Sequence, residues 1–247
     1  MTLDDLNAME PSALRAAFSD SPEQAIALLR VAAEGGAVEA QLLLGQASLD
    51  GTGTRADPHE ALTWFGKAAR TGHPMAMNMI GRCCEHGWGV AADSKAAAQW
   101  YRAAADRGLD WGMYNLATLL TLGQGVAEDR PAALALFRRA AAQGHAKSVN
   151  MIGSFLEDGW AVERDLEAAG EHFLCAAQGG DFRGMFNHAR MLLARDDEER
   201  AMRWLQRVPE SATPAFIAKV RDWLASTYPS LVAAFDSACA AGGADRG

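Results

Sequence analysis

Four stretches of this chain share one pattern: DGTGTRAD (50–57), HGWGVAAD (86–93), LGQGVAED (122–129) and DGWAVERD (158–165). Each begins 36 residues after the one before, and each ends on an aspartate. Glycine adopts left-handed backbone conformations without strain, and aspartate accepts hydrogen bonds from the free N–H groups of a helix that begins after it. The repeated stretch therefore predicts a tight turn followed by a new helix.

Other positions keep the same period. A small residue recurs at Gly45, Gly81, Ala117, Gly153 and Ala189, after a position that is apolar in the first four of these units, and glycine recurs at Gly36, Gly72, Gly108, Gly144 and Gly180. A longer period of 72 residues is also present. AMNMIG (76–81) is similar to SVNMIG (148–153), and GMYN (112–115) is similar to GMFN (184–187). Self-similarity at a fixed period indicates a repeat array, in which alternate units here are the more alike.

Each unit is predicted to form two helices. Apolar residues fall at helical spacing on both sides of the turn, and the second segment ends at a glycine, as in ALTWFGKAARTG (61–72). Stacked helix pairs bury one face against their neighbours. The predicted fold class is all-α: a right-handed α/α solenoid of 36-residue helix-turn-helix repeats with helical caps at both ends.

The period also predicts boundaries within a single solenoid domain, 1–247. We expect an N-terminal cap and half repeat at 1–36, full repeats at 37–72, 73–108, 109–144 and 145–180, and a degenerate fifth repeat at 181–208. The fifth unit has lost four loop residues and both glycines, in ARDDEERAMRWLQRV (194–208). A C-terminal helical cap is expected at 209–240 and a disordered tail at 241–247.

The repeated pattern resembles the Sel1-like repeat family, a relative of the tetratricopeptide repeat. The shared features are an apolar residue followed by a small one in the first helix, the glycine turn, the aspartate that ends the turn, and two adjacent aromatic residues in the second helix. The resemblance covers 37–180 and implies a protein-interaction scaffold and not an enzyme. A weaker resemblance rests on GLDWGMYNLATLL (108–120), GDFRG (180–184) and ATPAF (212–216). It is to bacterial repeat proteins that accompany iron(II)/2-oxoglutarate-dependent oxygenases.

Composition argues against several classes of partner. The net charge of −8 and the pI near 5.2 disfavour nucleic acid and anionic lipid, which both require clustered Lys and Arg. No apolar run is long enough for a membrane span or a signal peptide. The four cysteines, Cys83, Cys84, Cys175 and Cys239, recur at no common offset and so favour a reducing compartment. We therefore expect a cytoplasmic protein.

No stretch predicts catalysis, a cofactor or a metal site. The run Cys83-Cys84-Glu85-His86 offers metal ligands, but adjacent residues on a helix diverge by about 100°, so two buried thiols beside a turn are the favoured interpretation. His188 replaces the Leu or Ile of the other units at an inward position. It is interpreted as a core histidine with satisfied hydrogen bonds rather than as a functional base.

Binding residues are expected on the first helix of each unit, in a stripe that lines the concave groove. The stripe mixes aromatic rings and Met with Arg and Lys, as binding hot spots do, and its asparagines could hold the backbone of an extended peptide. The alternative is that the asparagines tie neighbouring helices together. The predicted groove residues are Met75, Asn78, Arg82, Trp111, Tyr114, Asn115, Lys147, Asn150, Arg183, Phe186, Asn187 and Arg190.

The predicted function is a non-catalytic scaffold or adaptor for a partner protein or extended peptide. The basic stripe of an acidic chain favours a partner with acidic or carboxylate groups. The site is expected to be centred on Trp111 and Tyr114. One alternative is a regulatory or accessory subunit of an enzyme, with an iron-dependent oxygenase as the candidate that the weaker resemblance implies. A hydrolase acting on cell-wall-type substrates is the least supported, because no nucleophile motif is present.

Overall fold

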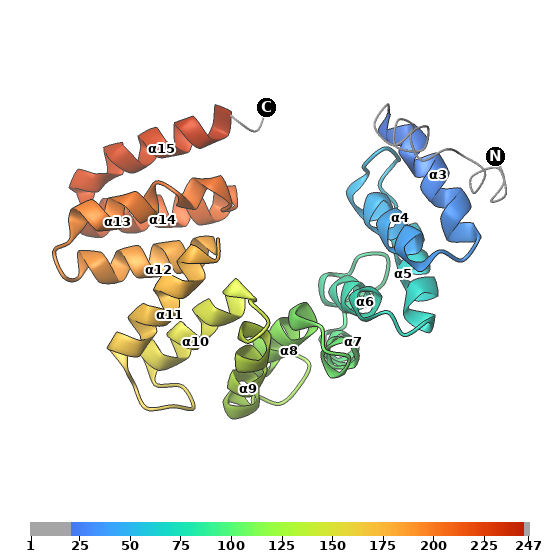
Figure 1. The fold of residues 1–247 in the computed structure, drawn as a ribbon, viewed down its shortest axis with the longest axis horizontal. Helices are drawn as coiled ribbons and strands as arrows, with labels where there is room; N and C mark the ends of the chain where they lie inside the picture. Colours follow the sequence, from blue (N-terminus) through green and yellow to red (C-terminus); the bar gives the residue numbers. More distant parts are fainter. Residues whose placement is uncertain (1–20, 245–247) are drawn as a thin grey trace. The chain divides into compact units, whose positions relative to one another are not determined.

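The computed structural model describes residues 21–244, which form α-helices and two short 3₁₀ helices with no strands among them (Figure 1). The helices are α3 (Pro22–Glu34), α4 (Val38–Asp50), α5 (Pro58–Arg70), α6 (Pro74–His86), α7 (Ser94–Asp106), α8 (Asp110–Leu122), α9 (Arg130–Ala141), α10 (Ala146–Asp158), α11 (Leu166–Gln178), α12 (Phe182–Leu193), α13 (Glu198–Leu205), η1 (Val208–Glu210), α14 (Pro214–Thr227), η2 (Pro229–Leu231) and α15 (Val232–Ala244). The all-α prediction is confirmed for this part of the chain.

The chain divides into two compact units, one ending at Asp129 and the other beginning at Arg130. Unit 1 contains α3 to α8, and unit 2 contains α9 to α15. The boundary falls in the glycine turn of the third repeat, between its two helices. We describe the units separately, and the continuity of one solenoid across the boundary stays a prediction.

The helices begin where the repeated aspartates predict. The Asp57 carboxylate accepts hydrogen bonds from the backbone N–H groups of residues 59 and 60, both at 3.0 Å. Asp93 and Asp165 cap α7 and α11 in the same way. The first helix of each of the four full repeats ends at a glycine with positive φ, for example 75° at Gly51. These caps satisfy backbone groups that a helix end otherwise leaves without partners.

The recurring small residue is a glycine with a packing role in the first, second and fourth repeats. A Cβ added to Gly45 of α4 would lie 2.6 Å from the ring of Phe65 in α5, and one added to Gly81 of α6 would lie 2.6 Å from Tyr101 in α7. In unit 2 the same relation joins Gly153 to the ring of Phe173. The aromatic side chain of the second helix therefore fills a notch in the first, which explains why both positions recur together.

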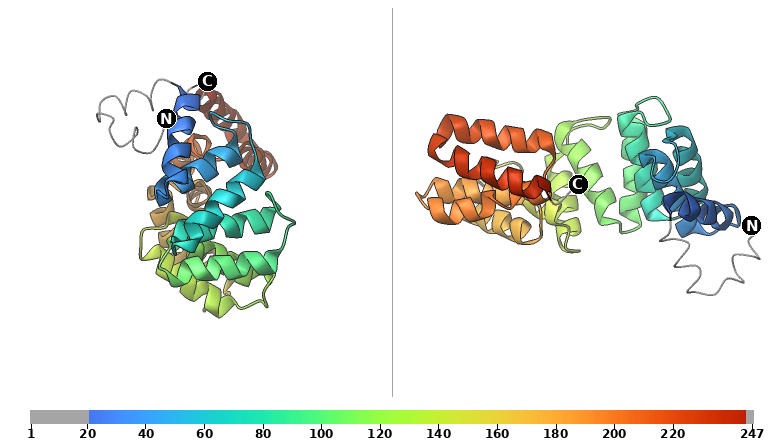
Figure 2. Two further views of the ribbon diagram at one scale, coloured as in Figure 1. Left: turned by 90° about the vertical axis from the view of Figure 1, so that its right-hand side faces the viewer. Right: turned by 90° about the horizontal axis from the view of Figure 1, so that it is seen from above.

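The fifth repeat and the C-terminal cap extend unit 2. A short loop of residues 194–197 joins α12 to α13, and these two helices pack together (Figures 1 and 2). Helix α15 packs on α13 and α14. It continues to Ala244, so the first four residues of the predicted disordered tail are helical instead. The rest of that tail and the N-terminal cap predicted within residues 1–20 lie outside the described residues.

No helix within residues 21–244 combines the length and the apolar character that crossing a membrane requires.

Candidate functional site

The predicted stripe lies on pairs of first helices that pack side by side within each unit. In unit 1 the pair is α6 and α8, and in unit 2 it is α10 and α12. Met75, Asn78 and Arg82 come from α6, while Trp111, Tyr114 and Asn115 come from α8. In unit 2, Lys147 and Asn150 come from α10, and Arg183, Phe186, Asn187 and Arg190 come from α12. The structure thus brings together the residues predicted within each unit.

The asparagines join neighbouring helices. The Asn115 side-chain amide donates to the Asn78 carbonyl oxygen at 2.9 Å, and Asn187 donates to Asn150 at 2.8 Å. Asn78 and Asn150 are only 3% and 4% exposed. A buried amide in such a bond is not available to a peptide backbone. These pairs therefore correct the interpretation of the asparagines as peptide-holding groups and match its alternative.

The unit 1 face keeps an exposed aromatic side chain. Trp111 is 37% exposed, and its ring meets that of Tyr114 edge-on with centroids 6.3 Å apart. On α6, the Arg82 guanidinium lies over the Trp88 ring, 5.2 Å from its centroid. Met75 is half-buried at the start of α6. This surface, which we call the α6–α8 face, is defined by Met75, Arg82, Trp111 and Tyr114.

Two of the predicted residues in unit 2 contact other side chains of the same unit. The Arg190 guanidinium donates to both carboxylate oxygens of Glu157 in α10, at 2.8 and 2.6 Å. Phe186 packs edge-on against Phe216 and Trp223 of α14, with ring centroids 5.8 and 5.2 Å apart. The C-terminal cap therefore covers Phe186, and Arg190 is neutralised by a partner. Both side chains are thus partly engaged within unit 2, and their place in a groove stays a prediction.

Arg183 and Lys147 flank a buried acid. Arg183 stacks over the rings of Phe182 and Phe216, 4.6 and 5.7 Å from their centroids. Burial raises the pKa of Asp181, while its hydrogen bond from the Gly184 N–H and the charges of Arg183 and Lys147 oppose that rise. The Asp181 carboxylate accepts the Gly184 N–H at 3.0 Å and so caps α12. Lys147 and Arg183 therefore place positive charge near this cap.

The Glu85 carboxylate near the end of α6 also has a partner within the protein. Glu85 accepts a hydrogen bond of 2.5 Å from the hydroxyl of Tyr101, a fully buried ring of α7. Burial, reinforced by this contact, raises the pKa of Tyr101. Cys83 and Cys84 are buried with free thiols, and burial raises the pKa of Cys83 to about 11. Neither thiol is thus prepared to act as a thiolate nucleophile.

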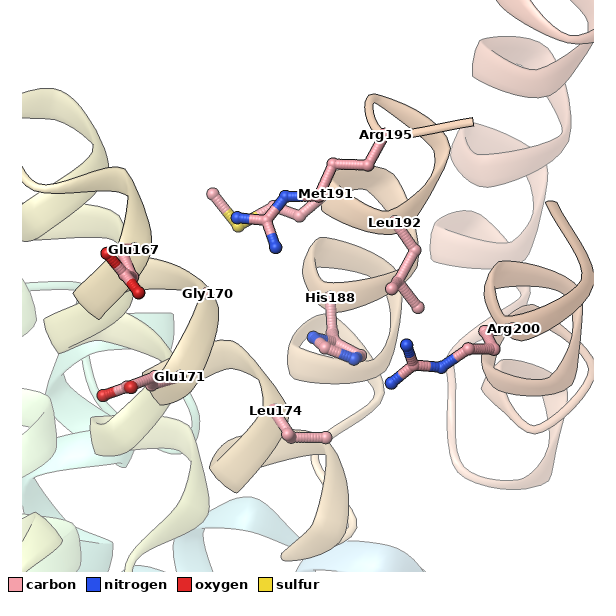
Figure 3. A pocket seen from close by; sticks show the side chains of 9 residues that line it. All are labelled: Glu167, Gly170, Glu171, Leu174, His188, Met191, Leu192, Arg195 and Arg200. Atoms are coloured by element: carbon pink, nitrogen blue, oxygen red, sulfur yellow. The ribbon is translucent and has the colours of Figure 1, made fainter. Parts of the chain in front are cut away.

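Sequence reasoning missed a pocket in unit 2. A cavity of about 280 Å³ lies between α11, α12 and the start of α13, with His188 among its lining residues (Figure 3). His188 is 9% exposed. His188 is thus buried, as the sequence predicts, but no hydrogen bond of good geometry within the described chain satisfies its ring. No cluster of three His, Cys, Asp or Glu residues suited to a metal ion occurs in the described part of the chain.

Comparison with known proteins agrees with this architecture. A Sel1 repeat structure from Oxalobacter formigenes has a TM-score of 0.76 at 24% identity, over 88% of this chain and 89% of that one. A protective antigen of uropathogenic Escherichia coli with an SLR fold has a TM-score of 0.67 at 25% identity. That match covers 94% of this chain, which spans about half (53%) of the antigen's length.

A third similar structure is an immunity protein from Pseudomonas aeruginosa, with a TM-score of 0.55 at 20% identity over 70% of this chain and 65% of that one. At this identity the likeness concerns the fold alone. A search of curated proteins gave no match.

The family comparison covers most of the repeats. The Sel1 repeat pattern matches residues 18–36, 38–73, 74–109, 112–145, 146–181 and 184–207. These segments include the four full repeats predicted from the glycine turns, the half repeat before them and the shortened repeat after them. The chain belongs to the Sel1 repeat family.

Proposed function

We propose that this chain is a non-catalytic interaction scaffold that binds a partner protein or extended peptide on the α6–α8 face of unit 1. Trp111 and Tyr114 supply the aromatic contacts, and Arg82 supplies positive charge. The Sel1 repeat family generally mediates protein–protein interaction, which supports the class of function. The choice of face and the nature of the partner are our proposal.

The exposure of Trp111 carries the proposal. Among the large hydrophobic side chains that are exposed in the described residues, Trp111 is the only aromatic one. Trp and Tyr are the residues most enriched at binding hot spots, because a large rigid ring loses much water-exposed area at little entropic cost. An edge-on Trp–Tyr pair on a helix face is therefore a suitable anchor for a partner.

The charge of Arg82 favours an acidic partner. Its guanidinium contacts the Trp88 ring and the Met79 sulfur, at 3.7 Å, and no carboxylate among residues 21–241 forms an ion pair with it. A partner carboxylate at this position would pair with a cation held in place by an aromatic ring. We propose that the partner presents an acidic residue next to an apolar one.

The experiment has two stages. A photo-crosslinking phenylalanine analogue placed at position 111 should capture the partner in cells of the source organism, whereas the same analogue at Leu122, also exposed on α8, should not. With the purified partner, Trp111→Ala should raise Kd about 30-fold, equivalent to about 2 kcal/mol. Leu122→Ala is the matched control and should leave Kd unchanged.

Two results would contradict the proposal. One is an unchanged Kd for Trp111→Ala, and the other is a loss of helical circular dichroism in that variant, which would make the ring a packing residue. If the captured partner is an enzyme whose activity changes on binding, the scaffold acts as an accessory subunit. The scaffold itself is expected to turn over no ester, peptide or glycan substrate.

A further inference from the structure

The pocket in unit 2 arises where the repeat pattern is broken twice. At the position of Gly170 the earlier repeats have Leu62, Ala98 and Leu134, and at the position of His188 they have Leu44, Ile80, Leu116 and Ile152. Gly170 lies in the middle of α11, and His188 lies opposite it on α12. A missing side chain on one helix and a polar one on the next leave an open cavity where earlier repeats place apolar side chains.

His188 makes this cavity polar at its base. Its ring meets Trp204 edge-on, with centroids 5.8 Å apart. Both ring nitrogens are buried and form no hydrogen bond of good geometry in the described chain, although the Gly170 backbone lies close enough to affect the ring. A neutral imidazole carries one donor and one acceptor, and a buried polar group without a partner is costly. A group that enters the cavity and accepts a hydrogen bond from His188 would remove this cost.

Two arginines converge on the same space. Arg195 follows α12 and Arg200 belongs to α13, and both line the pocket. The Arg200 guanidinium extends toward His188, and that of Arg195 extends over Met191 on the side facing α11 (Figure 3). Arg195 forms no ion pair within residues 21–241. Arg200 forms one ion pair there, with Asp197 at 3.3 Å, and the Arg200 side chain remains largely exposed. On the opposite wall, Glu167 and Glu171 also line the pocket, and the Glu171 side chain points away from His188 (Figure 3). The charged side chain beside His188 is therefore the cation Arg200.

The remaining wall is apolar. Leu174 of α11 and Met191 and Leu192 of α12 line the cavity, and its volume of about 280 Å³ exceeds that of a simple inorganic ion. Small-molecule sites generally combine apolar walls with a few convergent polar groups. The combination here suits a branched or linear hydrocarbon group that ends in an anion.

We propose that this pocket binds a carboxylate on a short apolar stem, with Arg195 and Arg200 holding the carboxylate and His188 donating a hydrogen bond to it. Arginine forks match carboxylate geometry, and the apolar stem would lie against Met191 and the leucines. The carboxylate could belong to a free organic acid or to the C-terminal residue of a partner chain. This site is separate from the α6–α8 face and does not depend on it.

The test uses three probes of matched shape. 4-Methylpentanoate represents a free acid, N-acetyl-Ala-Ala-Leu represents a chain end, and 4-methylpentanamide is the uncharged control. Calorimetry should detect binding of at least one carboxylate and none of the amide. Nitrogen-detected NMR should show that the ring resonances of His188 shift and that bound carboxylate raises the pKa of His188. The tighter of the two carboxylates identifies the natural source of the group.

Variants separate this site from general anion binding. Arg195→Gln and Arg200→Gln should each raise Kd about tenfold or more, since each removes a charge-assisted hydrogen bond. His188→Leu, which restores the repeat pattern, should abolish binding. Arg203→Gln is the matched control, because Arg203 lies on α13 outside this cavity. Circular dichroism and melting curves establish that each variant is folded.

Three outcomes would overturn the proposal. The first is that neither carboxylate binds, so that the pocket holds water only. The second is equal binding of acid and amide, and the third is binding that Arg195→Gln and Arg200→Gln leave unchanged in folded protein.

Discussion

Asn115 of α8 donates a 2.9 Å hydrogen bond to Asn78 of α6, and 72 residues later Asn187 of α12 donates a 2.8 Å bond to Asn150 of α10. The position equivalent to Asn78 in the third repeat is Tyr114, and the position equivalent to Asn115 in the fourth is Met151. The amide pair thus recurs at every second step of the array. This gives the 72-residue period in the sequence a structural cause.

Replacing one asparagine of a pair should destabilise the protein, because the amide of the other asparagine then lacks its hydrogen-bond partner. Asn78→Ala or Asn115→Ala should each lower the free energy of unfolding by about 1–2 kcal/mol, because a buried amide loses its hydrogen bond. In a double-mutant cycle the two changes should couple by about 1 kcal/mol. Urea unfolding measures both quantities.

The pair in unit 2 serves as an independent replicate. Asn150→Ala and Asn187→Ala should show the same coupling. Additive losses in both cycles would mean that the amides act separately and that the observed hydrogen bonds contribute nothing to stability.

Relieving backbone strain in the fourth glycine turn should stabilise the protein. Ala161 has φ of 58°, whereas the equivalent Gly53, Gly89 and Gly125 adopt similar angles without a side chain. Left-handed backbone costs a non-glycine residue about 1 kcal/mol, so Ala161→Gly should raise the melting temperature. Differential scanning calorimetry measures the shift.

The control for this change is Ala91→Gly in the second turn, where φ is not positive. It should lower stability slightly, because glycine gains more freedom in the unfolded chain. Equal effects of the two substitutions would show that the angle at Ala161 stores no strain.

The stability of unit 2 should depend on pH through His188. Burial, together with the nearby charges of Arg200 and Arg195, lowers its pKa below the usual 6.5, while the Gly170 carbonyl opposes the shift. The unfolded state then binds a proton more readily, so stability is full above about pH 6.5 and falls as the pH decreases toward the folded-state pKa. Glu167 and Glu171 also line the cavity, and the Glu171 side chain points away from the ring (Figure 3).

His188→Leu should remove this dependence and restore an apolar contact. Chemical unfolding at several pH values between about 7 and 5 measures it, with His59→Gln on the exposed face of α5 as the control. A wild-type stability curve that stays parallel to that of His188→Leu across this window would contradict the prediction.

Removing the acid opposite Arg190 should weaken the α10–α12 contact. Glu157→Gln loses a bidentate, half-buried ion pair, and we expect a loss of about 1 kcal/mol in unfolding free energy. The loss should shrink at high salt, since the charges are partly exposed. Glu163→Gln, at an exposed loop position, is the control; a loss as large as that of Glu157→Gln would assign the effect to net charge.

The sequence predicted the helices well because their ends are marked locally. The turn glycines and capping aspartates act within a few residues, and the notch at Gly81 faces a ring at Tyr101 in the same repeat. Periodicity therefore contains the information needed for α4 to α12. The same reasoning from glycines mispredicts the C-terminal end of helix α15. This helix continues to Ala244 through two glycines, whereas glycines elsewhere in the chain mark turns.

The roles of the stripe residues depended on contacts between repeats and could not be predicted in the same way. Asn78 lies at the edge of the stripe, so its burial is decided by α8 and not by its own helix. The pairing of Arg190 with Glu157 joins two repeats. Phe186 is covered by α14, a helix outside the repeat pattern that no period could place.

The glycine–aromatic contact and the asparagine pair constrain in different ways how such an array can gain repeats. The glycine–aromatic contact lies inside one repeat, so a duplicated repeat of 36 residues keeps it intact. The asparagine pair links two successive repeats, and the positions equivalent to it at the next junction hold no such pair. A single inserted repeat would therefore place an asparagine against an apolar or aromatic neighbour. Growth by two repeats at a time preserves both contacts, which makes the 72-residue pair the natural unit of duplication in this chain.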